Sequence, residues 1–212
     1  MSAQLLWTEL KKHYPVGKPF LRFENPLESI VATILSAQCT DDQVNKVTPA
    51  LFKKYKSCQA FLKVPVGELE ADIKSTGFFH NKAKSIRGMC STVLEEFAGR
   101  IPDTMEELLT LPGIGRKTAN VVLSQAFGKI EGVVVDTHVV RLSGRLAFST
   151  ESDPVKIEQD LMRLFPKKDW YALSMVLIRH GRALCIARKP RCPECFLKDL
   201  CPHPDKTTAC LS

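Results

Sequence analysis

Residues 111–120 read LPGIGRKTAN and join two stretches whose apolar residues recur at helical spacing. Pro112 cannot continue the preceding helix, because it lacks a backbone N–H. Gly113 and Gly115 allow positive φ angles and let another backbone come close. A helix that begins directly after this turn presents unpaired N–H groups, which attract anions. The stretch therefore predicts a helix, a tight turn and a second helix that can hold a DNA phosphate; an ordinary corner between two helices is the alternative.

Helical spacing extends through most of the chain. One apolar stripe occupies residues 27–38 behind an Asn25 cap. A second occupies residues 86–97, and further stripes follow the turn. The only strand-like run, at residues 133–135, is short and is interpreted as an extended connector. The pattern predicts an all-α fold.

The composition is that of a folded globular protein with an excess of positive charge. The chain has 212 residues, 44% of them hydrophobic and 25% charged, with a net charge of +7. This balance favours a polyanionic partner such as nucleic acid. The N-terminus does not resemble a signal peptide, and no apolar run reaches the ~18 residues of a membrane helix. A reduced, cytoplasmic compartment is therefore expected. Four cysteines are expected to be free thiols there: Cys39, Cys58, Cys90 and Cys210.

Four further cysteines lie within 17 residues near the C-terminus and can converge on one metal centre: Cys185, Cys192, Cys195 and Cys201. Zinc sites built from four thiolates usually consist of two short C-x2-C pairs. Only one such pair exists here, and the wider gaps favour the larger cage of an iron–sulfur cluster, with zinc as the alternative. The loop between the first two cysteines is rich in cations, and we expect it to face an anion.

Two residues are candidates for chemistry. Lys117 lies in the first turn of the helix after the LPGIG turn, where the helix dipole disfavours a cation. The same dipole favours the neutral amine, which is the nucleophilic form. Asp136, which follows 19 residues later, is a candidate carboxylate for the same site. A solvated lysine and an ordinary helix N-cap are the purely structural interpretations of these two residues.

Several motifs occur together and in one order. They are LPGIGRKTAN at 111–120, VDTH at 135–138 and the four cysteines, preceded by LSAQCTD at 35–41. This combination resembles the endonuclease III family of helix-hairpin-helix DNA glycosylases over nearly the whole chain. The resemblance implies a [4Fe-4S] cluster on the four cysteines. It also implies two helical domains with DNA in the cleft between them. Residues 19–129 would form a helical barrel with the hairpin, and residues 1–18 with 130–212 would carry the cluster.

The resemblance further implies a bifunctional DNA glycosylase and AP lyase of base excision repair that removes oxidised pyrimidines. Such an enzyme flips the damaged base out of the duplex. Lys117 would attack C1′ of the sugar, and the resulting Schiff base would lead to β-elimination and cleavage on the 3′ side. Asp136 would assist departure of the base.

The same resemblance assigns DNA contacts. Gln38 would fill the gap left by the flipped base. Phe78 would be the wedge residue, at a position where many relatives have Leu. The remaining expected contacts are Gly113, Gly115 and Arg116 in the hairpin and Arg188, Lys189 and Arg191 in the cysteine loop.

The expected partner is double-stranded DNA with damaged bases or abasic sites, bound at the nucleoid by a monomer that does not contact a membrane. Adenine glycosylases look similar but lack Lys at this position and carry an extra C-terminal domain. The sequence leaves two further kinds of protein open: a monofunctional mismatch glycosylase, which Lys117 disfavours, and a DNA-binding module that binds without cleaving the strand.

Overall fold

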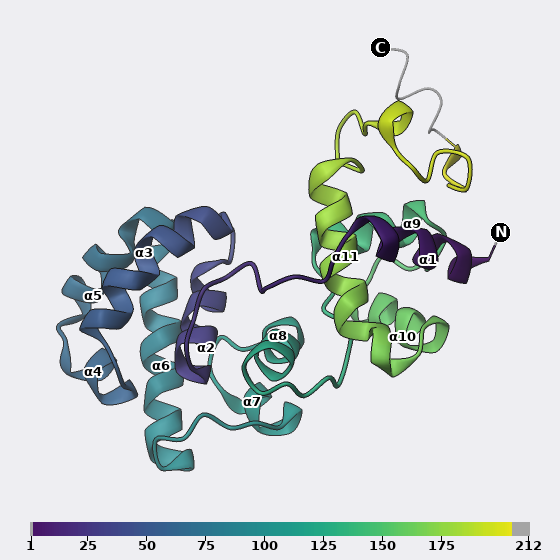
Figure 1. The fold of residues 1–212 in the computed structure, drawn as a ribbon. Coiled ribbons are helices and arrows are strands. Elements are labelled where there is room, and N and C mark those ends of the chain that lie inside the picture. Colours follow the sequence, from purple (N-terminus) through teal and green to yellow (C-terminus); the bar gives the residue numbers. More distant parts are fainter. Residues whose placement is uncertain (1, 205–212) are drawn as a thin grey trace. The chain divides into compact units, whose positions relative to one another are not determined.

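The computed structural model describes residues 2–204, which form helices joined by turns and loops (Figure 1). No strand occurs within this range, so the predicted all-α fold is confirmed, and residues 133–135 are a buried connector. None of the helices within residues 2–204 is long and apolar enough to cross a membrane. Cys210 lies outside the described residues.

The chain divides into two compact units. One consists of residues 19–131, and the other combines residues 1–18 with residues 132–212. The sequence predicts domains of 19–129 and 1–18 with 130–212, which differ from these units by two residues at one boundary. Their separate functional roles stay a prediction.

The unit of residues 19–131 is built around the long helix α6. Its helices are α2 (Pro26–Leu35), α3 (Asp41–Lys54), α4 (Cys58–Lys63), α5 (Val66–Ile73), the 3-10 turn η1 (Lys74–Thr76), α6 (Phe79–Phe97), α7 (Met105–Thr110) and α8 (Arg116–Ala126). Helix α6 packs against α2, α4 and α5, and α8 packs against α2 and α7. The predicted apolar stripe of α6 is buried in this core: Ile86, Met89, Cys90 and Val93.

Helix α2 begins as predicted but ends early. The Asn25 side chain accepts a hydrogen bond from the Glu28 N–H at 3.0 Å. The stripe predicts a helix through Gln38, whereas α2 ends at Leu35. The chain tightens there, because the Ala37 N–H donates to the Ile34 carbonyl three residues back, at 3.3 Å. Gln38 therefore lies in a turn.

The other unit joins the N-terminal helix to the C-terminal part of the chain. Its helices are α1 (Ala3–His13), α9 (Thr137–Arg145), α10 (Pro154–Leu164), the 3-10 turn η2 (Lys167–Asp169), α11 (Trp170–Ala183) and the 3-10 turn η3 (Cys192–Glu194). Helix α11 packs against both α1 and α9. Trp7 of α1 is buried and stacks edge-on against Phe165, with ring centroids 6.0 Å apart.

The LPGIG turn joins α7 to α8 and packs on α6. Ile114 points inward and is buried, as is Leu111. Gly113 has a φ of +80°, and a Cβ atom there would lie 2.8 Å from the Cβ of Ser85 in α6. Gly115 has a φ of −100° and open space around it. Only the first glycine is therefore required by both backbone conformation and packing.

We expect Gly113→Ala to lower the free energy of unfolding by about 2 kcal/mol, because it adds left-handed strain and a clash with Ser85. Gly115→Ala is the matched control and should change it by less than about 0.5 kcal/mol. Urea unfolding of the two variants tests this. Equal losses of stability would show that the contact with Ser85 does not constrain the turn.

Candidate nucleic-acid interface and metal centre

Helix α8 begins at the hairpin with an uncapped N-terminus. Gly115 is its N-cap and supplies no side-chain hydrogen bond, and the first turn contains no acidic residue. The backbone N–H groups of a first turn have no partner within their own helix. Gly113, Gly115 and Lys117 are all exposed, while Arg116 is half-buried. This end of α8 can therefore receive an anion such as a phosphate.

A pocket in the unit of residues 19–131 brings three separate segments together: the turn after α2, the start of α6 and the hairpin. Its lining includes Gln38, Phe78, Lys82, Ser85, Gly113 and Thr118. Three of the predicted DNA contacts thus share one surface. The pocket lining includes Gly113 and Thr118 but not the residues between them that were predicted as site residues, which are Gly115, Arg116 and Lys117.

Two residues of this pocket combine exposure with a strained backbone. Gln38 has a φ of +52° and Phe78 a φ of +48°, a left-handed conformation that costs a non-glycine residue roughly 1–2 kcal/mol. Phe78 is 61% exposed, more than any other large apolar side chain within residues 2–204. An exposed aromatic side chain held in this way is suited to insertion between bases.

Asp136 is the N-cap of α9 in the other unit. Its Oδ1 accepts hydrogen bonds from the N–H groups of His138 and Val139, each at 2.9 Å. These two bonds fix the orientation of a half-buried carboxylate. The His138 ring lies 3.1 Å from an Arg141 guanidinium nitrogen, and burial lowers the pKa of His138 and so favours the neutral ring. The His138 ring is therefore held by contacts with Arg141 of its own helix and with Gly181 of α11.

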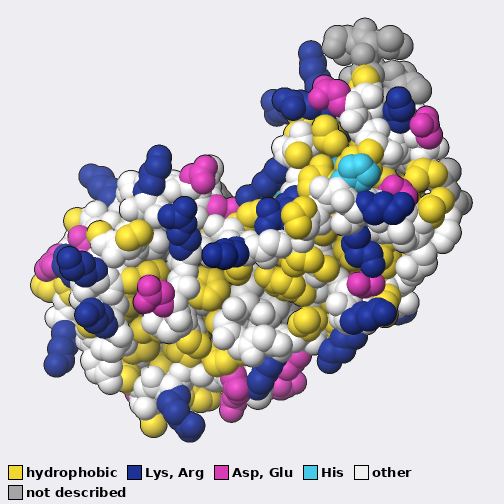
Figure 2. Space-filling model, in the orientation of Figure 1, with side chains coloured by type: hydrophobic (Ala, Val, Ile, Leu, Met, Phe, Trp, Pro, Cys, Tyr) yellow, Lys and Arg dark blue, Asp and Glu magenta, His cyan; other side chains and the backbone are white. Residues whose placement is uncertain are grey.

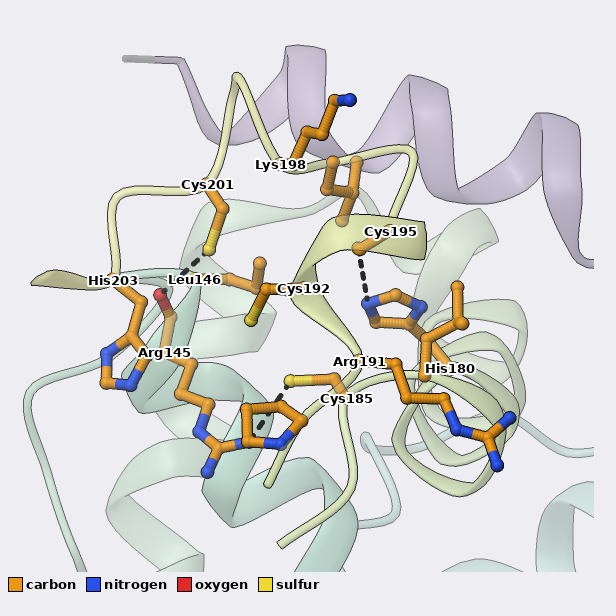
Figure 3. A pocket seen from close by; sticks show the side chains of 13 residues that line it. Arg145, Leu146, His180, Cys185, Arg191, Cys192, Cys195, Lys198, Cys201 and His203 are labelled. Atoms are coloured by element: carbon orange, nitrogen blue, oxygen red, sulfur yellow. Dashed lines mark hydrogen bonds between the residues drawn. The ribbon is translucent and has the colours of Figure 1, made fainter. Parts of the chain in front are cut away.

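The four C-terminal cysteines surround one cavity (Figure 3): Cys185, Cys192, Cys195 and Cys201. Within residues 2–204, no three His, Cys, Asp or Glu side chains stand close enough together to hold a single metal ion. An all-sulfur set around a wider space suits an iron–sulfur cluster, whose ligands stand farther apart than those of one ion.

Side chains from α9 and α11 hold this cysteine loop. Arg145 donates hydrogen bonds to the Cys185 sulfur at 3.3 Å and to the Ile186 carbonyl at 2.8 Å. His180 is buried, with its Nε2 3.8 Å from the Cys195 sulfur and its Nδ1 3.2 Å from the Tyr14 hydroxyl. Burial lowers the pKa of His180 to about 4, which keeps the ring neutral. When Tyr14 donates to Nδ1, the Nε2–H faces the sulfur, so Arg145 and His180 both direct N–H groups toward cysteine sulfur atoms.

The predicted basic residues of the cysteine loop point to solvent. Arg188, Lys189 and Arg191 are all exposed, and Lys189 has a φ of +53°. Dark blue Lys and Arg side chains are also spread over the surfaces of both units in Figure 2. The loop therefore offers cations that are available for phosphate contacts.

Comparisons with known proteins agree with this geometry. Residues 31–167 match the family described as HhH-GPD superfamily base excision DNA repair protein, and residues 185–201 match the iron-sulfur binding domain of endonuclease III. The chain is 57% identical to endonuclease III of Synechocystis sp. over 193 residues, which is 91% of this chain and 88% of the relative. It is 48% identical to endonuclease III of Bacillus subtilis over 189 residues, which is 89% of this chain and 86% of the relative.

Solved structures extend the likeness to the fold. A non-covalent endonuclease III–DNA complex matches with a TM-score of 0.92 and 42% identity, covering 97% of this chain and 96% of the other. A trapped endonuclease III–DNA covalent intermediate matches with a TM-score of 0.91 and 42% identity, covering 97% of both chains. With its hairpin turn and its four-cysteine loop, this chain belongs to the endonuclease III family of base excision repair proteins.

Proposed function

We propose that this protein, a DNA glycosylase and AP lyase of base excision repair, uses Lys117 as its nucleophile. Its DNA substrates carry damaged bases or abasic sites, and we assign the bases to the oxidised pyrimidines. The observation that carries the proposal is an exposed primary amine in the first turn of α8, directly after a turn suited to a phosphate. A primary amine is the group that such a lyase needs to form a Schiff base.

The proposed chemistry begins at the sugar. The neutral Lys117 amine attacks C1′, and the base leaves with the electron pair of its bond to C1′. Loss of a proton from nitrogen and opening of the sugar ring give a Schiff base between Nζ and C1′. Removal of a C2′ proton then expels the 3′ phosphate as the leaving group. The first step requires the amine in its neutral, nucleophilic form.

Asp136 is proposed to assist the departure of the base. A carboxylate stabilises positive charge as it develops on the sugar and can help to move a proton. Its two hydrogen bonds from α9 hold it in one orientation without using a second side chain. This rigidity suits a group that must face charge developing in a transition state.

Base extrusion is proposed to depend on Gln38 and Phe78. Flipping a nucleotide costs a few kcal/mol of stacking and pairing energy. Phe78 would enter the base stack as a wedge, and Gln38 would occupy the space that the base leaves. Gly113, Gly115 and Arg116 would hold the phosphate backbone alongside.

The [4Fe-4S] cluster is a structural tether in this proposal. When bound, it links the four cysteines into one rigid loop, and it supplies no step of the bond-breaking chemistry. Arg188, Lys189 and Arg191 on that loop would then contact phosphates. The protein would act as a monomer and would be found at the nucleoid.

Borohydride trapping on a duplex with one abasic site tests the nucleophile. We expect Lys117→Ala to lose the covalent adduct by on the order of a thousandfold or more, because no Schiff base can form. Lys129→Ala is the control, since that amine is engaged with Asp103 at 2.6 Å. An undiminished adduct in Lys117→Ala would refute the assignment, because another amine would then form the Schiff base. No adduct with the unmodified protein would favour a DNA-binding protein without lyase chemistry.

Metal analysis tests the cluster. The purified protein should be yellow-brown and contain iron and sulfide in equal amounts. Cys192→Ser should lose iron and bind DNA more weakly, because the cysteine loop loses its tether. Stoichiometric zinc without iron would contradict the cluster.

The salt dependence of DNA affinity tests the cysteine loop. Arg188→Ala should weaken binding to all duplexes alike and lower the slope of log affinity against log salt by about one. Lys156→Ala, an exposed cation of α10 in the same unit, should leave the slope unchanged. An unchanged slope in Arg188→Ala would remove Arg188 from the interface.

A further inference from the structure

We propose that Lys82 is a positioning residue for base extrusion, which holds the turn of Gln38 and the turn of Phe78 in a fixed relation to each other. The inference rests on the proposed roles of Gln38 and Phe78. The two turns are defined here as residues 36–39 (the Gln38 turn) and residues 76–78 (the Phe78 turn). Lys82 itself need not touch DNA.

One buried ammonium group joins these two turns. The Lys82 Nζ donates hydrogen bonds to the carbonyl of Leu35 and to the carbonyl of Thr76, each at 2.8 Å. Leu35 is the last residue of α2, immediately before the Gln38 turn, and Thr76 begins the Phe78 turn. Lys82 is only 4% exposed. A single side chain therefore fixes two segments that are distant in sequence.

The position of this lysine is unfavourable for helix stability. Lys82 lies in the first turn of α6, at the positive end of the helix dipole. Both groups that it contacts in these bonds are neutral carbonyls, and burial lowers its pKa. Taking an ammonium out of water to bond neutral carbonyls carries a large desolvation cost. A role in stability alone therefore gives a weak reason for a lysine here.

The same face of α6 also carries the hairpin. Lys82 and Ser85 are three residues apart and so lie on one face of the helix, and Gly88 follows three residues after Ser85. A Cβ atom on Gly113 would lie 2.8 Å from the Ser85 Cβ, and one on Gly88 would lie 3.2 Å from the Pro112 Cβ. Helix α6 thus sets the hairpin directly and the two turns through Lys82.

Strain in the two turns makes such a tie necessary. Gln38 and Phe78 both have left-handed backbones, at φ angles of +52° and +48°. Conformations of this kind persist only where the surrounding structure over-determines them. Without the ammonium, both turns can relax toward ordinary φ values, and the wedge and the gap-filling side chain would lose their alignment.

The test compares Lys82→Met with Arg87→Met. Arg87 is a matched control, because it also projects from α6 and donates to two backbone carbonyls, those of Phe61 and Val64, at 2.9 and 2.8 Å. These carbonyls lie at the end of α4 and just beyond it, in neither of the two turns. Single-turnover base release is measured on a duplex with one oxidised pyrimidine, and borohydride trapping on a duplex whose site is already abasic.

We expect Lys82→Met to slow base release by roughly ten- to hundredfold, the scale of a small misplacement of catalytic groups. Trapping on the abasic duplex should fall much less, because no base has to be extruded. Arg87→Met should lower the melting temperature without this selective loss. Equal effects of Lys82→Met on both duplexes, or the same pattern in Arg87→Met, would overturn the proposal.

A double-mutant cycle separates positioning from general loosening. In a Gln38→Ala/Phe78→Ala background, Lys82→Met should slow base release little further, because the side chains that it positions are gone. A full additional loss would overturn the proposal. If Gln38→Ala and Phe78→Ala leave base release unchanged, the proposed extrusion residues fail, and the inference about Lys82 fails with them. If they slow release and Lys82→Met does not, only the inference about Lys82 fails.

A second variant guards against misfolding. Should Lys82→Met fail to fold, Lys82→Gln replaces it in the same cycle. The shorter amide keeps a donor for one carbonyl at most, so the tie between the turns is still broken. Lys82→Gln must slow base release more than trapping on the abasic duplex, and it must add little further loss in the Gln38→Ala/Phe78→Ala background. Failure of either result overturns the proposal.

Discussion

In the unit of residues 19–131 the hairpin packs so tightly against α6 that residue 113 has no room for a side chain. A Cβ atom there would lie within 2.9 Å of both the Cβ and the Oγ of Ser85. This contact fixes the turn from which α8 departs, and with it the uncapped helix end and Lys117. Because the neighbouring turns of Gln38 and Phe78 are joined to α6 as well, one helix face sets the whole candidate DNA-binding surface of this unit.

A second helix plays the equivalent part in the other unit. Helix α9 begins at Asp136, whose carboxylate caps it, and ends at Arg145, which donates to the cysteine loop. Arg141, one turn before Arg145, donates to the carbonyls of Gly181 and Cys185. The proposed catalytic carboxylate and the metal-binding loop are therefore held by opposite ends of one short helix.

Local patterns made much of this predictable from the sequence. The apolar stripe of α6, the cap at Asn25 and the turn around Gly113 depend on neighbours within a few residues, and the structure contains all three. Lys82, Arg145 and His180 escaped prediction because the partners of their side chains, apart from Thr76, lie at least 15 residues away in the chain. A lysine near the start of a helix, the signal that singled out Lys117, could have drawn attention to Lys82 as well. The end of α2 was also misplaced, because the apolar stripe continues past the residue where the backbone tightens.

Non-glycine residues with a left-handed backbone occur in two settings, at the ends of helices and among the proposed DNA contacts. Five non-glycine residues within residues 2–204 have positive φ: Gln38, Phe78, Ala98, Ala147 and Lys189. Ala98 caps the end of α6 and Ala147 follows the cap of α9, where a left-handed residue commonly ends a helix. The other three belong to the proposed DNA contacts and are exposed, although Phe78 is also the N-cap of α6 and Gln38 lies in the turn after α2. At these three positions the left-handed backbone accompanies an exposed side chain of the proposed DNA-binding set, which suits a role in aiming that side chain at a ligand.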